Sequence, residues 1–247
     1  MSTGIWSAAS GAVSRTFALD VAANNVSNSE TPGFRADRSV FRQEMVRAMD
    51  GAMGTQSLRY TTTRTREPDL AAGQLLHTGR SLDAALTDSE SFFVVQTPQG
   101  PRYTRAGNLQ LNPDGRLTTT EGYAYLGEGG STLEVPSDTK SVQLSPSGEL
   151  LFDGLASGLK LSVVKFNNPR ALEKEGDVLM RAPRAAGAPE SVEAQIEPET
   201  LEMSNSSALR TMTTLVNTTR EFEMIAKVIE AFSNVEHKAA TEVGRAR

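Results

Sequence analysis

The chain contains no cysteine and only two histidines, His77 and His237, among its 247 residues. Without cysteine there is neither a disulfide framework nor a thiolate metal site, and two histidines leave little scope for imidazole-based metal or nucleophile chemistry. Calcium-loop spacing and a phosphate-binding glycine motif are also missing. We therefore predict no enzymatic activity, no catalytic or cofactor-binding residues, no metal site and no cofactor.

Apolar material is scarce for the length of the chain, with 38% hydrophobic and 6% aromatic residues. Some segments are therefore expected to become buried only against another subunit. No apolar run approaches the roughly 18 residues that span a membrane, and the N-terminus lacks the pattern of a cleaved signal peptide. The net charge of −5 argues against nucleic acid and anionic membrane surfaces as partners.

Two apolar stripes with the seam spacing of a coiled coil stand at opposite ends of the chain. The first stripe comprises Ile5, Ala9, Ala12, Thr16, Leu19, Ala23 and Val26. The second stripe comprises Met212, Leu215, Thr219, Phe222, Ile225, Ile229 and Phe232. This pattern predicts two long helices that pair with each other and with neighbouring subunits, and it favours assembly over catalysis.

The boundaries of both helices can be predicted from local residue types. The first helix is expected over residues 4–29, because Thr31, Pro32 and Gly33 cannot continue it. The second is expected to begin near Ser204 or Asn205, which are good N-caps, and to run to about residue 236. The tail over residues 241–247 is expected to fray.

The predicted fold class is α+β, with the two terminal helices paired as a coiled-coil-like axial domain around an irregular, mainly antiparallel β body. Four segments are expected: an N-terminal axial helix at 1–30, an extended connector at 31–80, a β-rich body at 81–198 and a C-terminal axial helix at 199–247. Within the connector, Phe41, Met45 and Met49 favour a short helical piece. A mobile linker is the alternative for the connector as a whole.

Three hairpins and one further strand are predicted in the body from apolar runs separated by Pro/Gly turns. The hairpins pair residues 91–96 with 102–105, 109–111 with 116–119, and 142–144 with 149–152. The further strand covers residues 159–166. Repeated short strands of this kind are typical of a small antiparallel domain.

Three amides near the end of the first helix, Asn24, Asn25 and Asn28, lower its helix propensity. One interpretation is a fraying helix end. The other is that their side chains bond to neighbouring helices and define the register, as a buried asparagine does in coiled coils.

Several blocks of the sequence resemble the flagellar rod and hook proteins. LDVAANNVSNSETPGFR at residues 19–35 is similar to the N-terminal signature of that family, and LEMSN at residues 201–205 is similar to the C-terminal one. Blocks at residues 81–86, 92–96, 102–108 and 114–117 resemble the body that its members share. The short path over residues 34–73 favours the proximal rod members, and a distal rod or hook-type subunit is the alternative. A self-contained binding or catalytic domain is the competing class.

The resemblance implies a structural subunit that polymerises helically into the hollow drive shaft of the flagellum. It implies a place in the basal-body rod in the periplasm, reached by export without a cleaved signal peptide. The implied partners are other copies of the chain, other rod proteins and the flagellar export apparatus, with the surrounding ring proteins as a further candidate. The predicted assembly interface comprises Ile5, Ala9, Ala12, Leu19, Asn24, Asn25, Val26, Asn28, Thr31, Pro32, Gly33, Phe34, Met212, Leu215, Phe222, Ile225, Ile229 and Phe232.

Overall fold

The computed structural model describes residues 3–45 and 59–245, which divide into two compact units. Unit 1 combines Met1–Val26, Asp37–Glu67 and Ala208–Arg247, so it contains both ends of the chain. Unit 2 combines Ser27–Ala36 with Pro68–Ser207. The chain therefore passes from unit 1 to unit 2 and back twice, and each unit is built from segments that are far apart in sequence.

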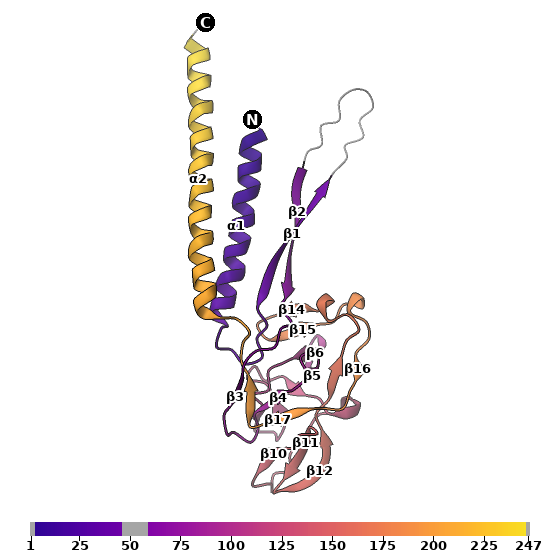
Figure 1. Cartoon of the computed structure of the whole chain (residues 1–247). Coiled ribbons are helices and arrows are strands. Elements are labelled where there is room, and N and C mark those ends of the chain that lie inside the picture. Colours follow the sequence, from indigo (N-terminus) through magenta and orange to yellow (C-terminus); the bar gives the residue numbers. More distant parts are fainter. Residues whose placement is uncertain (1–2, 46–58, 246–247) are drawn as a thin grey trace. The chain divides into compact units, whose positions relative to one another are not determined.

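Unit 1 contains two long helices and a two-stranded sheet (Figure 1). The helices are α1, Thr3–Ser27, and α2, Ala208–Arg245; the strands are β1, Asp37–Met45, and β2, Arg59–Pro68. The α+β class and the two terminal helices are confirmed. The predicted end of the second helix, near residue 236, is wrong, because α2 continues to Arg245.

The helices α1 and α2 run in opposite directions beside each other within unit 1. Arg15 Nε lies 3.1 Å from Glu221 Oε2, and a Cβ atom placed on Gly11 would lie 3.7 Å from Cδ1 of Ile225. From one contact to the other the residue number rises by four in α1 and falls by four in α2, as expected for antiparallel helices. Whether the pair forms a regular coiled coil stays a prediction.

The connector differs from the expected short helix. Phe41 and Met45 belong to strand β1, and Met49 lies outside the described residues. A spacing of four residues also places side chains on one face of a strand, since a strand repeats every two residues. None of the described helices is long and apolar enough to span a membrane.

Unit 2 contains a β body of short strands. Its first strands are β3 Leu75–His77, β4 Ala84–Leu86, β5 Phe92–Thr97, β6 Gly100–Thr104, β7 Gln110–Leu111, β8 Leu117–Thr118 and β9 Ala124–Tyr125. The later strands are β10 Val142–Leu144, β11 Glu149–Phe152, β12 Leu155–Lys160, β13 Val163–Lys165, β14 Glu173–Glu175, β15 Leu179–Arg181, β16 Glu190–Ser191, β17 Ile196–Pro198 and β18 Thr200–Glu202. Three 3-10 turns lie between them at Glu128–Gly130, Pro169–Ala171 and Arg184–Ala186.

These strands form one large sheet and several small ones. The main path of the large sheet is β14-β15-β6-β5-β9-β8-β7, and β13 pairs with both β5 and β16. A separate three-stranded sheet has the order β10-β11-β12, while β17 pairs with β4 and β18 pairs with β3. All of the pairings with a recorded register in the body are antiparallel, which confirms the predicted antiparallel body.

Strand β5 is the centre of the body because its side chains serve two cores. Phe93 and Val95 pack into one apolar cluster with Tyr125, whereas Phe92 and Val94 pack into another. Alternate residues of a strand point to opposite faces, so a strand buried on both faces is a continuous apolar run. The sequence FFVV at residues 92–95 is such a run.

The three predicted hairpins are confirmed as the pairs β5–β6, β7–β8 and β10–β11. The single strand predicted over residues 159–166 is wrong, because that stretch is divided between β12 and β13. At the break, Leu161 N–H donates to Gly148 O and Ser162 N–H donates to Leu126 O. The chain thereby leaves the three-stranded sheet and enters the large one.

Candidate functional site

Three segments of unit 2 meet at a buried cluster of charges, which we call the junction: Arg35, Arg105 and Glu202. The Glu202 carboxylate lies 2.8 Å from Nη1 of Arg35 and 2.6 Å from Nη2 of Arg105. All three side chains are 1% exposed. Residues that are far apart in sequence are therefore held together where the chain has just left α1 and will shortly enter α2.

All three guanidinium nitrogens of Arg105 donate hydrogen bonds. In addition to Glu202, it donates to the carbonyl oxygens of Leu86 at 3.0 Å, Asp88 at 2.6 Å and Ser91 at 2.5 Å. These contacts connect the loop between β4 and β5 to the end of β6. A buried guanidinium needs such partners because its desolvation is costly.

Arg35 is less completely paired than Arg105. Its Nη1 donates to Ala71 O and contacts Glu202, while Nε and Nη2 have no hydrogen-bond partner among the described residues. Burial lowers the pKa of Arg35 from its ordinary value, the Glu202 carboxylate opposes that shift, and the Arg105 cation adds to it. Because two cations share one carboxylate, loss of Glu202 would remove the ion-pair partner of both arginines.

Backbone bonds tighten the same junction. Gly33 N–H donates to Glu202 O at 2.7 Å, and Gly73 N–H donates to Glu202 Oε1 at 2.9 Å. Lys174 Nζ lies 3.7 Å from the centre of the Phe34 ring, which is a cation–π contact. Phe34 is completely buried and Lys174 is part-buried, so the Phe34 ring belongs to the interior of unit 2.

Asn205 belongs to the junction instead of capping α2, so its predicted role is wrong. Its Oδ1 accepts from Ala36 N–H at 2.7 Å, and its Nδ2 donates to Asp69 O at 2.8 Å and Ala71 O at 2.9 Å. The helix begins three residues later, at Ala208. Its amide therefore bridges the segments that precede and follow the β1–β2 sheet.

Neither interpretation of the helix-end amides accounts for Asn25. In unit 1 its Nδ2 donates to Asp37 O and its Oδ1 accepts from Asp37 N–H, both at 2.8 Å. The amide thus pairs like a backbone group with the first residue of β1. In unit 2, Asn28 donates to Asp177 Oδ1 at 3.4 Å and accepts from Thr31 Oγ1 at 3.1 Å.

We expect Asn25→Ala to lower the free energy of unfolding of unit 1 by about 1–3 kcal/mol, because both backbone groups of Asp37 lose a buried partner. The helix signal in far-ultraviolet circular dichroism, followed during urea unfolding, measures this loss. Asn217→Ala at an exposed position of α2 is the matched control. Equal effects of the two variants would contradict the role assigned to Asn25.

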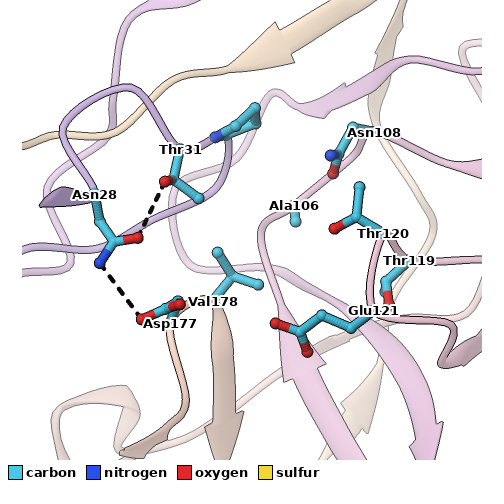
Figure 2. A pocket seen from close by; sticks show the side chains of 10 residues that line it. Asn28, Thr31, Ala106, Asn108, Thr119, Thr120, Glu121, Asp177 and Val178 are labelled. Carbon is cyan, nitrogen blue, oxygen red and sulfur yellow. Dashed lines mark hydrogen bonds between the residues drawn. The ribbon is translucent and has the colours of Figure 1, made fainter.

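A pocket of about 190 Å³ lies in unit 2 beside the segment that follows α1 (Figure 2). It is lined by Asn28, Thr31, Pro32, Ala106, Asn108, Thr119, Thr120, Glu121, Asp177 and Val178. Of this set, Glu121, Asp177 and Thr120 are exposed and Asn108 is part-buried, whereas Asn28 is buried. Small ligands and cofactors usually occupy about 300–1,000 Å³, so this pocket suits a single side chain better.

The predicted interface residues fall into three groups. On the helices, Ile5, Ala9, Ala12, Leu19, Asn24, Val26, Leu215, Phe222, Ile225 and Ile229 are part-buried, while Met212 and Phe232 are exposed. In the segment after α1, Thr31 and Pro32 line the pocket with Asn28, and Gly33 and Phe34 are buried within unit 2. Asn25 is buried against β1. Asn25, Gly33 and Phe34 are thus buried within the chain, whereas Thr31 and Pro32 are part-buried beside the pocket.

A second apolar stripe on α2, absent from the predicted set except for Phe232, has no cover from α1. It comprises Met224, Val228, Ala231, Phe232 and Val235. Met224, Val228 and Val235 are 58%, 46% and 64% exposed. Steps of four, three and four residues place Met224, Val228, Ala231 and Val235 on one face of a helix. This face differs from the Leu215, Phe222 and Ile229 face.

Comparison with known proteins places these features in a family. The model of the flagella basal body rod protein family matches residues 6–35, and that of the flagellar hook protein FlgE/F/G D1 domain matches residues 88–152. The flagellar basal-body rod protein FlgF of Salmonella typhimurium is 32% identical over 246 residues, covering 94% of both chains. The chain belongs to the flagellar basal-body rod proteins. FlgF of Caulobacter vibrioides is 26% identical to this rod protein over 227 residues, covering 92% of each.

Relatives that are named FlgG instead of FlgF are also similar to this rod protein. FlgG of Bacillus subtilis is 29% identical over 232 residues, covering 85% of this chain and 88% of its own. The two family models together include two members of the junction, Arg35 and Arg105. Sequence reasoning selected the blocks that contain all three charges but missed their ion pairs, since nothing in the blocks indicates which distant residue each charge meets.

Proposed function

We propose that this rod protein is a subunit of the proximal part of the flagellar rod. It polymerises helically into the hollow drive shaft that transmits torque from the motor to the hook. The observation that carries the proposal is the similarity to FlgF proteins over nearly the whole chain. A distal position, as for FlgG, is the second candidate because FlgG proteins are also similar.

In this proposal unit 1 builds the wall of the shaft. The α1–α2 pair forms a coiled-coil-like axial domain through the predicted stripes, and the Arg15–Glu221 ion pair supports their antiparallel register. The uncovered stripe on α2 packs against the helices of neighbouring copies. Such a contact joins two different surfaces of successive copies. When the rotation from one copy to the next does not close a ring, its repetition generates a helical filament.

Unit 2 stiffens the shaft in this proposal. The junction supports this role, because torque on a subunit acts on the segments that connect its helices to its body. A buried cluster of charges and backbone bonds resists small displacements, since moving any member leaves another unpaired. We do not assign a small-molecule ligand to this rod protein.

The axial helices are only marginally stable in the free subunit and become more stable when the subunit joins the rod. Four threonines near the start of α2 donate to the carbonyl four residues earlier, and such bonds slightly destabilise and bend helices: Thr213, Thr214, Thr218 and Thr219. A chain with marginal helices suits passage in an unfolded form through the flagellar export apparatus into the periplasm.

Complementation of a strain that lacks this chain tests the proposal. We expect rods to be restored, and labelled subunits to lie at the motor-proximal end of isolated basal bodies. Label at the hook end would support the distal alternative. Limited proteolysis of the purified chain provides a second test: rapid cleavage at both ends with survival of unit 2 is expected, whereas resistance throughout would favour a self-contained domain.

Val228→Glu is expected to abolish incorporation into rods while leaving the folded monomer unchanged, because a charge on the uncovered stripe cannot be buried without a partner. Co-purification of the chain with basal bodies measures incorporation. Asn234→Glu places the same side chain on the polar face of α2 and should assemble normally. Loss of incorporation in both variants would contradict the role of the stripe.

A further inference from the structure

The pocket beside the segment after α1 contains carboxylate and other hydrogen-bond acceptors, but no positively charged side chain of its own lining. Glu121 has no hydrogen bond or ion pair with the described residues, and Asp177 accepts only the bond from Asn28 that was described above. The side chains of Asn108 and Thr120 also have no recorded partner in the described part of the chain. None of the ten lining residues is basic. An arginine guanidinium, which has five donors and no acceptor, matches this set.

The distribution of charge along the chain indicates where such an arginine comes from. Strands β1 and β2 contain five arginines, no lysine and three acidic residues. Residues 68–207, which make up most of unit 2, contain 19 acidic and 11 basic residues. The β1–β2 sheet and the β body are therefore complementary in charge. The exclusive use of arginine also suits carboxylates, which its planar fork can bind in a bidentate manner.

We propose that Arg66 of strand β2 from a second copy of this chain enters the pocket between Glu121 and Asp177. The inference rests on the proposed function, because it identifies one contact between successive subunits. The two halves of this contact are different surfaces of one chain, so the contact is heterologous and repeats along a filament. Arg66 is exposed and lies 5.6 Å from the Phe17 ring centre, which leaves its donors available.

The contact is expected to define orientation more than to supply affinity. Exposed ion pairs contribute little to binding energy, but complementary charges steer encounter and suppress wrong registers. The pocket adds shape to charge, since Pro32, Ala106 and Val178 give it apolar walls. An arginine stem can lie along such walls while its head reaches the carboxylates.

Crosslinking in assembled rods tests the proposal, and the absence of native cysteine makes the introduced pairs the only thiols of the chain. The chain carries Glu121→Cys together with Arg66→Cys and replaces the natural copy in its host. Isolated basal bodies are treated with a short bismaleimide, because an arginine–carboxylate pair holds its Cβ atoms too far apart for a disulfide. We expect a ladder of crosslinked multimers of this chain on a denaturing gel.

The control pairs the same β2 cysteine with Glu128→Cys, an exposed acidic position outside the pocket. Loss of the ladder in the control, with the ladder retained for Glu121→Cys, supports the inference. Chain present in the basal bodies without a ladder overturns it, as does a crosslink within one chain, a crosslink to a different protein or an equal ladder in the control. Failure of the cysteine-free natural chain to enter basal bodies would instead contradict the proposed function.

A charge exchange provides a second, cysteine-free test. Glu121→Arg combined with Asp177→Arg is expected to abolish swimming, as is Arg66→Glu. The three changes together should restore swimming in soft agar if the two surfaces meet. A triple variant that stays immotile while the protein is folded and exported would contradict the inference.

Discussion

Glu202→Gln is expected to lower the free energy of unfolding of unit 2 by about 3–5 kcal/mol, because it removes the counterion of two buried arginines. Arg35 and Arg105 are each 1% exposed, so neither can recover its hydration without opening the core. The change keeps the size of the side chain, which separates loss of charge from loss of packing. Urea unfolding followed by near-ultraviolet circular dichroism of the tyrosines in unit 2 measures the effect.

Two further variants make this prediction specific. Glu197→Gln removes an exposed carboxylate from the neighbouring strand β17 and should change stability by no more than about 0.5 kcal/mol. Replacement of all three junction charges by methionine should recover much of the stability, because an apolar cluster of similar volume has no charge to desolvate. If Glu202→Gln were as mild as Glu197→Gln, the junction would not be the buried ion cluster described above.

Gly33→Ala is expected to destabilise unit 2 by more than about 4 kcal/mol, an effect that few single substitutions reach. Gly33 has a φ of +73°, and a Cβ atom there would lie 2.2 Å from the backbone nitrogen of Ala106. The neighbour is backbone and cannot move aside as a flexible side chain could. The change should displace the segment after α1 from the junction, because Gly33 N–H bonds to Glu202 O.

Gly79→Ala is a closely matched control for this prediction. Gly79 has nearly the same φ, +72°, but a Cβ atom there meets nothing within 4 Å. It should therefore cost only the left-handed backbone strain of about 1–2 kcal/mol. The difference between the two variants isolates the collision with Ala106. Equal costs, measured by the same urea unfolding, would mean that the close approach at Gly33 is not required for folding.

Short-range patterns predicted most of the secondary structure. The 25-residue helix α1 follows from its apolar steps and from the break at Thr31, Pro32 and Gly33. The hairpins follow from Pro/Gly turns between apolar runs. Such signals act over a few residues, so they can be recognised without knowledge of the fold.

The errors arise where a local pattern has two readings or where a side chain serves a distant segment. Phe41 and Met45 suit both a helix and a strand, and pairing between β1 and β2 decided for the strand. Asn205 has the chemistry of an N-cap, but its amide instead satisfies Ala36, Asp69 and Ala71. An asparagine cannot indicate by its own sequence context which of these tasks it performs.

The sequence by itself determined the α+β class, the two terminal helices, the antiparallel hairpins and, through its motif blocks, membership of the flagellar rod proteins. Only the tertiary structure decided that Arg35, Arg105 and Glu202 share one buried site, that Asn25 pairs with Asp37, and that unit 2 contains an acidic pocket. Periodicity and turn chemistry are local properties of the chain. Buried charges and pockets depend instead on which distant residues become neighbours, and that is settled by packing the whole chain at once.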